Sequence, residues 1–338
     1  KQYCVIYIRM MMNKKEITQM KNTILEYNRK PTLSPAFDKL LYGYIKSGKY
    51  MSVERLQLLR NNIVQNLVEY ANKYKISNVV LGISGGIDSA LTASLFRDAG
   101  YHVIGVTMPI NQIEDETDRG VETCHALGID HRHIDLTEAY EDILKQQYKL
   151  DASLISNDHS SKIRKGNIRA RLRMITLYNL AGASQGFVAS TDNFSELAAG
   201  FWTLHGDVGD VSPIQSLSKS WEVPALAEMQ GVPDSVVFAV PTDGLGISSS
   251  DEDQFGFSYL EFDLALFKLL ENMDGVEFEQ SAADVAGFKD VKDKLIVESV
   301  ANRIRSTTYK RFNPFNLKHT FEKDRYDLLD KLDNQLRR

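Results

Sequence analysis

The chain has 338 residues, of which 43% are hydrophobic and 25% charged, and its formal net charge is −5. This composition is typical of a globular protein with a sizeable core, and the acidic balance argues against a protein that coats nucleic acid. Two cysteines, Cys4 and Cys124, without a Cys-x-x-Cys motif, exclude a disulfide scaffold and a cysteine-rich zinc site and indicate a reducing compartment. No stretch is long and apolar enough to cross a membrane, so we expect a cytoplasmic protein without a membrane partner.

Strand and helix patterns alternate along most of the chain. Residues 1–52 are predicted to be an N-terminal extension of unknown role, and an apolar stripe at helical spacing predicts a helix over 54–74. The alternation that follows indicates an α/β fold, a doubly wound parallel sheet with flanking helices, Rossmann-like. We expect strands at 78–83, 102–108, 131–135 and 186–190, and helices at 89–98, 115–127, 138–148, 167–182 and 219–230. The polar stretch 241–256 is expected to be a loop, either a solvated linker or a lid over a site.

The turn between the first strand and its helix, 82–89, reads GISGGIDS. Its glycines let the backbone approach a ligand closely, and the amides at the helix start favour an anion such as phosphate. Ser84 and Ser89 add hydroxyl donors. Asp88 would repel a phosphate unless a divalent cation lay between the two groups. The turn therefore predicts a site for a polyphosphate bound together with Mg²⁺.

Two other interpretations of this turn remain open. Residues 82–86 have the G-x-S-x-G spacing of a hydrolase elbow, in which Ser84 would be the nucleophile and His205 the candidate histidine. The turn is not a Walker loop, because the lysine of that motif is missing. A purely structural turn is the third possibility.

Two later segments carry further candidates. In the helix 167–182, helical spacing predicts that Arg169 and Arg173 share one face and that Arg171 and Tyr178 share another with Met174. A guanidinium beside an aromatic ring suits an anionic ligand with a flat ring, although charged helix residues often only decorate a surface.

The other segment follows the strand at 186–190 and contains Glu196. The carboxyl ends of parallel strands meet at one sheet edge, so Asp88 and Glu196 are candidates to share a Mg²⁺ ion. Glu196 as an ordinary surface acid at a helix start is the alternative.

Taken together, these segments resemble the ammonia-dependent NAD synthetases of the N-type ATP pyrophosphatase group. SGGIDS (84–89) marks only the wider group, whereas the GN-x-x-AR-x-RM-x-x-x-Y segment (166–178) and GDVGDVSP (206–213) are far more specific. The resemblance covers roughly residues 54–318. It implies an adenine nucleotide alpha-hydrolase-like fold, with a synthetase domain over 53–320 and a C-terminal tail over 321–338.

The resemblance also implies an activity. A ligase of this family makes NAD from deamido-NAD, ATP and ammonia through an acyl-adenylate, and releases AMP and pyrophosphate. A homodimer is implied as well. The residues before the catalytic region are too few for a built-in glutaminase domain, so we expect free ammonia or a separate partner to supply the nitrogen. The rivals are another enzyme of the group such as a tRNA thiolase, a serine hydrolase, and a non-catalytic nucleotide-binding module.

Matching positions give the implied site. Asp88 and Glu196 match the Mg²⁺ ligands, and Asp88, Asp207 and Lys219 match catalytic positions, with Asp207 where ammonia is received. The ATP contacts match Gly82, Ser84, Gly85, Gly86, Asp88, Ser89, Thr191, Lys219 and Thr242. The deamido-NAD contacts match Arg171, Tyr178, Asp207, Asp210, Lys310 and Arg311. Thr107 stands where bacterial enzymes often have an arginine that contacts adenine.

Overall fold

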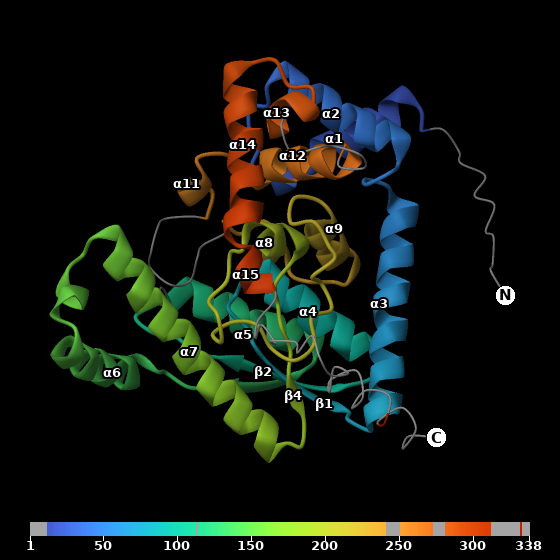
Figure 1. Ribbon diagram of the computed structural model, residues 1–338. Coiled ribbons are helices and arrows are strands. Elements are labelled where there is room, and N and C mark those ends of the chain that lie inside the picture. The colour runs from blue at the N-terminus through green and yellow to red at the C-terminus, as the bar shows by residue number, and fades with distance from the viewer. Residues whose placement is uncertain (1–11, 113, 241–250, 273–280, 312–331, 333–338) are drawn as a thin grey trace.

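A computed structural model describes residues 12–112, 114–240, 251–272, 281–311 and 332. Its helices and strands fall into an α/β layer and a helical layer, which lie one above the other in Figure 1. The long helix α3 (Val53–Tyr74) runs beside both layers. Within the described ranges, no helix is long and apolar enough to cross a bilayer.

The α/β layer is built on a four-stranded parallel sheet in the order β3-β2-β1-β4. The strands are β1 (Asn78–Gly82), β2 (His102–Thr107), β3 (Asp130–His133) and β4 (Phe187–Val188). Val80 at the centre of β1 pairs with Ile104 on one side and Val188 on the other. The ends of β1, β2 and β4 therefore open at one edge of the sheet, as the sequence predicts.

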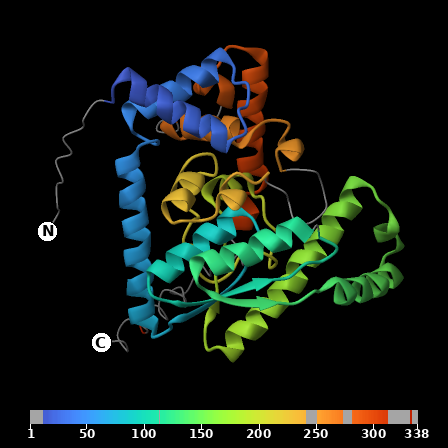
Figure 2. The ribbon, with the colours of Figure 1, turned by 180° about the vertical axis from the view of Figure 1, so that it is seen from behind.

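Helices cover both faces of the sheet, so the predicted doubly wound architecture is confirmed (Figures 1 and 2). Because side chains alternate along a strand, Val80 and Ile104 pack in one core with α6 (Thr137–Leu150) and α7 (His159–Ala183), whereas Val79 and Leu81 pack in the other. That other core holds α3, α4 (Ile87–Asp98) and α5 (Glu114–Leu127). Residues 89–96 of α4 are all buried, which makes α4 the central helix of the fold.

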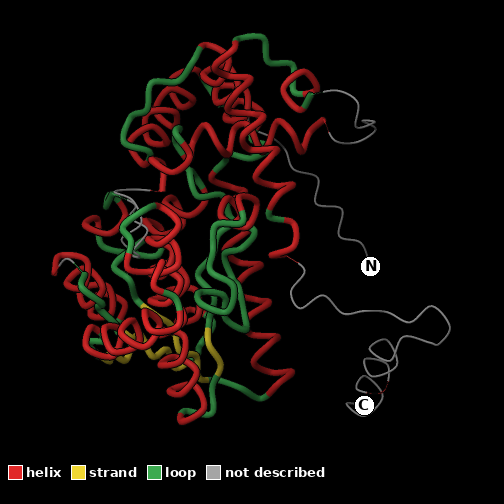
Figure 3. Tube along the Cα trace, turned by 60° about the vertical axis from the view of Figure 1, so that its left-hand side comes forward, coloured by secondary structure: helices red, strands yellow, loops and turns green. Residues whose placement is uncertain are grey.

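The helical layer contains α1 (Lys14–Tyr27), α2 (Pro35–Ser47), α12 (Tyr259–Asn272), α13 (Ala282–Val285) and α14 (Val291–Ser306). Figure 3 shows this layer at the end of the molecule away from the strands. Ser34 caps the start of α2 and Pro35 suits its first turn, while Gly48 ends it at φ 59°. Phe37 is fully buried and its ring lies 5.1 Å from that of Phe288. Residues of the predicted N-terminal extension thus share one continuous core with the sheet.

Short elements complete the chain: η1 (Ala152–Ile155), α8 (Phe194–Ala199), α9 (Glu222–Met229), α10 (Asp234–Val237), α11 (Asp251–Phe255) and α15 (Thr308–Arg311). Some boundaries differ from the sequence prediction. The helix expected at 167 begins at His159, because Asp158 caps it there, and the helix expected at 219 begins at Glu222. The predicted loop 241–256 contains α11, and its residues 241–250 lie outside the described ranges. So does the tail 321–338 apart from Leu332.

The packing of α2 predicts a clear stability effect. Phe37→Ala removes a fully buried ring and should lower the free energy of unfolding by about 3–5 kcal/mol, because it leaves a cavity against Phe288. Tyr42→Ala on the same helix, where the side chain is 39% exposed, is the matched control and should change it far less. Chemical unfolding of both variants measures the difference, and equal losses would show that the α2 contact carries no special weight.

Candidate functional site

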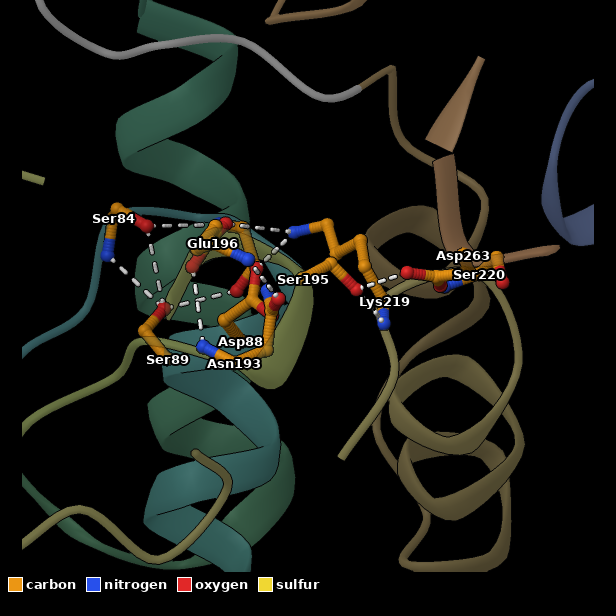
Figure 4. Close-up of polar contacts among 10 residues, drawn as sticks. Ser84, Asp88, Ser89, Asn193, Ser195, Glu196, Lys219, Ser220 and Asp263 are labelled. Carbon is orange, nitrogen blue, oxygen red and sulfur yellow. Dashed lines mark hydrogen bonds and ion pairs between the residues drawn. The ribbon is translucent and has the colours of Figure 1, made fainter. Parts of the chain in front are cut away.

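The turn 82–89 forms a compact loop at the carboxyl end of β1 (Figure 4). Gly85 has φ +80°, and a Cβ there would lie 2.1 Å from the backbone oxygen of Glu116 in α5, so the position requires glycine. The Gly86 amide donates to Ser84 Oγ at 3.2 Å, and Ser89 Oγ donates to the Gly86 carbonyl at 2.9 Å. Gly86 caps α4 without a side-chain hydrogen bond, which leaves the helix start suited to an anion.

Asp88 and Glu196 come together beside this loop, as the strand-end argument predicts. The Lys219 ammonium pairs with Asp88 and lies 3.7 Å from Glu196 Oε1. Asn193 connects the same two carboxylates: its Nδ2 donates to Asp88 Oδ1 at 3.0 Å, and its backbone amide donates to Glu196 Oε2 at 3.2 Å. The side chains of Lys219, Asp88 and Glu196 are only 10%, 17% and 14% exposed, so their charges interact with little screening by solvent.

These carboxylates fit a Mg²⁺ ion. They are hard oxygen donors, and the ammonium that they hold is itself a cation at the position between them. Among the described residues, no group of three or more His, Cys, Asp or Glu side chains could form a closed metal site. Mg²⁺ is commonly held by one or two carboxylates plus substrate phosphates, and the glycine loop lies directly beside this pair.

A buried network, which the sequence analysis missed, supports Lys219 (Figure 4). The Lys219 backbone amide donates to Ser195 Oγ at 3.0 Å, and that hydroxyl donates to Asp263. Asp263 also accepts from the Ser220 amide at 2.9 Å. Burial raises the pKa of Asp263 to about 6. The available signal was a carboxylate within the apolar run of α12, where a buried charge must have partners.

The loop and the acidic cluster open into a cavity of about 710 Å³. Of the predicted site residues, those that line it are Gly82, Ser84, Gly85, Gly86, Asp88, Ser89, Arg171, Thr191, Glu196, Asp207, Lys219 and Lys310. Thr107 lines it too, and its hydroxyl lies 3.0 Å from His131 Nε2 and 2.9 Å from His133 Nδ1. This single cavity brings together residues that are widely separated along the chain.

Arg173 also lines the cavity, although the helical spacing had grouped it with Arg169. Its Nε donates to the Met108 carbonyl at 3.1 Å, and burial lowers the pKa of its guanidinium to about 10. Arg169 lies elsewhere, over the Tyr140 ring at 4.9 Å, in a separate cleft of about 350 Å³. The two arginines lie one turn apart on the continuous helix α7, as the spacing predicts, and the charge of Arg169 helps to lower the pKa of Arg173, but they line different clefts.

Two carboxyl groups lie close to Lys310 in the cavity wall. Asp207 Oδ1 accepts from the Thr203 amide at 2.8 Å, and desolvation, followed by the charge of Asp192, raises its pKa well above the usual range. Asp192 is 6% exposed, and desolvation raises its pKa to about 7. The Lys310 ammonium donates to the carbonyls of Gly200 and Trp202 at 2.6 and 2.5 Å. Asp192 was not among the predicted residues.

Three predicted substrate residues do not line this cavity. The Tyr178 hydroxyl donates to Asp210 Oδ1 at 2.8 Å, and Asp210 Oδ2 accepts from the Val188 amide at 3.0 Å, so the pair ties α7 to β4. Arg311 donates to the carbonyls of Leu197 and Ala198 at 3.0 and 3.2 Å, at the end of α8. Thr242 lies outside the described residues.

The hydrolase interpretation finds no support in this geometry. In the described part of the chain, the hydrogen bonds of the Ser84 side chain involve Ser89 and Gly86 rather than a histidine. His205 does not line the cavity. Cys124 is buried in α5, and desolvation raises its pKa to about 12, so it is no thiolate nucleophile either.

The buried carboxyl group of Asp192 predicts a pH effect on stability. The folded protein keeps a proton on Asp192 up to a pKa of about 7, whereas the unfolded chain releases it near the ordinary value of 3.8. The folded state thus binds more protons between these values, and the free energy of unfolding should fall as pH rises through this window. In magnesium-free buffer, Asp192→Asn should flatten that fall. Asp118→Asn, an exposed control, should keep the wild-type slope; identical slopes for all three proteins in urea unfolding would contradict the assignment.

Comparison with known proteins finds similar enzymes over most of the chain. The NAD synthase family model matches residues 59–314. The NH3-dependent NAD+ synthetase of Methanosarcina acetivorans is 33% identical over 269 residues, which cover 78% of this chain and 98% of that one. The corresponding enzyme of Alkaliphilus metalliredigens is 37% identical, over 62% of this chain and 83% of the other.

Two solved structures at 26% identity are also similar. They are the NH3-dependent NAD synthetase of Campylobacter jejuni (TM-score 0.60, 78% of this chain and 99% of that one) and an NMN synthetase from Francisella tularensis (TM-score 0.62, 79% and 99%). The family match spans the glycine loop, the acidic cluster and the cavity wall. The chain belongs to the NAD synthase family of enzymes.

Proposed function

We propose that the protein makes NAD from deamido-NAD, ATP and ammonia, with AMP and pyrophosphate as the other products. The observation that carries the proposal is the single cavity in which the glycine loop, the Asp88–Glu196–Lys219 cluster and Asp207 face one another. A phosphate site, a cation site and a buried carboxylate within one cavity suit the activation of a carboxylate and its amidation.

The phosphates of ATP would bind at the loop. The Gly85 and Gly86 amides and the start of α4 would receive the β- and γ-phosphates, and Ser84 and Ser89 would add hydroxyl donors. Lys219 would turn from the carboxylates to the phosphates. Asp88 and Glu196 would hold a Mg²⁺ ion, whose charge would help to neutralise the leaving pyrophosphate.

The carboxylate of deamido-NAD would attack the α-phosphate, so that pyrophosphate leaves and an acyl-adenylate forms. Arg171 and Arg173 line the cavity wall and would orient an anionic substrate. Enclosure within the cavity would protect the adenylate from water.

Ammonia would reach the adenylate beside Asp207. Ammonium must lose a proton before it can attack, and a carboxylate whose pKa is raised by desolvation is a stronger base than an exposed one. The neighbouring Asp192 and the Lys310 ammonium would share the charge as the proton moves. Attack on the carbonyl then releases AMP.

We also propose that the enzyme is a cytoplasmic homodimer. Ile175 and Tyr178 on α7 are 66% and 44% exposed, which leaves an apolar edge beside Arg171. A symmetric contact along this helix would cover that edge. It would also bring Tyr178 and Asp210, which lie outside the cavity lining, toward a substrate that extends across the interface.

One assay tests the proposed reaction. The protein is mixed with ATP, Mg²⁺, ammonium and either deamido-NAD or nicotinic acid mononucleotide. The amide product, which is NAD or nicotinamide mononucleotide, is then quantified together with AMP and ADP. We expect NAD and AMP in equal amounts. Asp88→Asn should lower the rate about 100-fold or more, because about 3 kcal/mol of charge stabilisation is lost in the transition state.

Glu196→Gln should behave in the same way, whereas Asp118→Asn on the exposed side of α5 should retain wild-type activity. ADP as the nucleotide product would contradict α-phosphate activation. Preference for the mononucleotide would change the proposed substrate but not the chemistry, and near wild-type rates in both cluster variants would remove the shared-metal assignment.

The proposed dimer has its own test. Sedimentation at micromolar concentration should give about twice the chain mass of 38.2 kDa, and Ile175→Glu should shift the protein toward the monomer because it places a charge in an apolar contact. Tyr42→Glu, on the helical layer, is the control. A fully active wild-type monomer would contradict the dimer.

A further inference from the structure

The end of α1 contacts three separate segments, each of which carries a residue of the cavity wall close to the contact. Tyr27, Asn28 and Arg29 are consecutive, and they precede the first residue of the NAD synthase match, at 59. All three make contacts with residues far along the chain, at 220–252. We infer that this tripeptide positions Lys219 and the adjoining wall for ATP, a role that rests on the proposed function of Lys219.

Asn28 acts on the backbone beside Lys219. It is 6% exposed, and its Nδ2 donates to the Ser220 carbonyl at 2.8 Å and to the Ile24 carbonyl at 2.7 Å. The Ser220 amide is fixed from the other side by Asp263 at 2.9 Å. The backbone next to Lys219 is thus bound to α1 and α12 at once, which limits the positions that the Lys219 Cα atom can take.

Tyr27 contacts the second segment, which contains Glu228 and Phe238. Its hydroxyl bonds to Glu228 of α9, and its ring stacks on Phe238 with 5.9 Å between centroids and 25° between planes. Ala239 and Val240, which follow Phe238, line the cavity. The position of these two residues therefore depends on a ring from α1.

Arg29 contacts the third segment, which is α11. Its guanidinium pairs with Glu252 of α11, whose other carboxylate oxygen accepts from the Tyr259 amide at 2.8 Å. Gln254 of α11 lines the cavity, and the Tyr259 ring lies 5.8 Å from the Lys219 ammonium. Arg29 adopts φ 57°, a left-handed conformation that costs a non-glycine residue energy, and the contacts on both sides maintain it.

The test separates positioning from stability. Arg29→Gln removes the pair with Glu252, and Lys49→Gln removes a comparable pair between the end of α2 and Glu271, away from the cavity. For both variants and the wild type, we would measure the unfolding midpoint, the Kd for MgATP by calorimetry without turnover, and the KM values for ATP and deamido-NAD. Arg29→Gln should raise the Kd and KM for ATP roughly three- to tenfold while the KM for deamido-NAD stays within about twofold. Lys49→Gln should leave all three constants unchanged.

Arg29→Lys should recover most of the ATP affinity, and Asn28→Ala should weaken ATP binding in the same way through Ser220. If Asn28→Ala does not fold, the arginine variants still decide the question. An unchanged Kd for ATP in Arg29→Gln, or equal losses in Arg29→Gln and Lys49→Gln, would overturn the inference. Because the calorimetric Kd requires no product, a wild-type protein that binds ATP but makes no NAD would refute the proposed function alone.

Discussion

The contact among Asp88, Asn193, Glu196 and Lys219 is the interaction on which the site depends. It joins the first strand-end loop, the start of α8 and the segment before α9. Two carboxylates this close repel one another unless a cation lies between them. The fold satisfies that need with the Lys219 ammonium, and a bound metal would satisfy it with a stronger charge. The same charge requirement therefore serves the folded state and the proposed chemistry.

Around this contact, rigidity comes from backbone geometry and buried hydrogen bonds. Gly85 packs so tightly on α5 that no side chain fits, and α4 is buried along its length. Asp263 holds Ser195 and the Ser220 amide from beneath. An entirely apolar core could not fix these polar groups, because each needs a partner once it leaves water. The site is thus held in place by hydrogen bonds, and the buried hydrophobic core around α4 supports it.

The sequence predicted the parts that local patterns determine. The strand–turn–helix pattern located the loop at 82–89, and the parallel topology correctly placed Asp88 near Glu196. Helical spacing grouped Arg173 with Arg169 but could not show that they line different clefts, since spacing gives angles around an axis and not the location of the clefts beside it. Asp263 was missed because its partners Ser195 and Ser220 are distant in the sequence, and Asp192 because its burial beside Asp88 and Lys310 arises only in the folded chain. For the same reason the contacts of Asn28 could not be foreseen: an asparagine after a helix usually only ends it, and here its amide also reaches Ser220.

The two buried carboxyl groups beside Lys310 have a consequence for how binding is measured. With a pKa of about 7, Asp192 is partly protonated near neutral pH, where an exposed aspartate would be ionised, and desolvation raises the pKa of Asp207 in the same direction. A cation that enters the cavity favours their ionised forms, so its arrival expels protons into the solvent. The heat of binding then includes the heat with which the buffer takes up those protons. Calorimetric enthalpies for ammonium or magnesium will consequently differ between buffers of different ionisation heat, and the slope of that dependence counts the protons released.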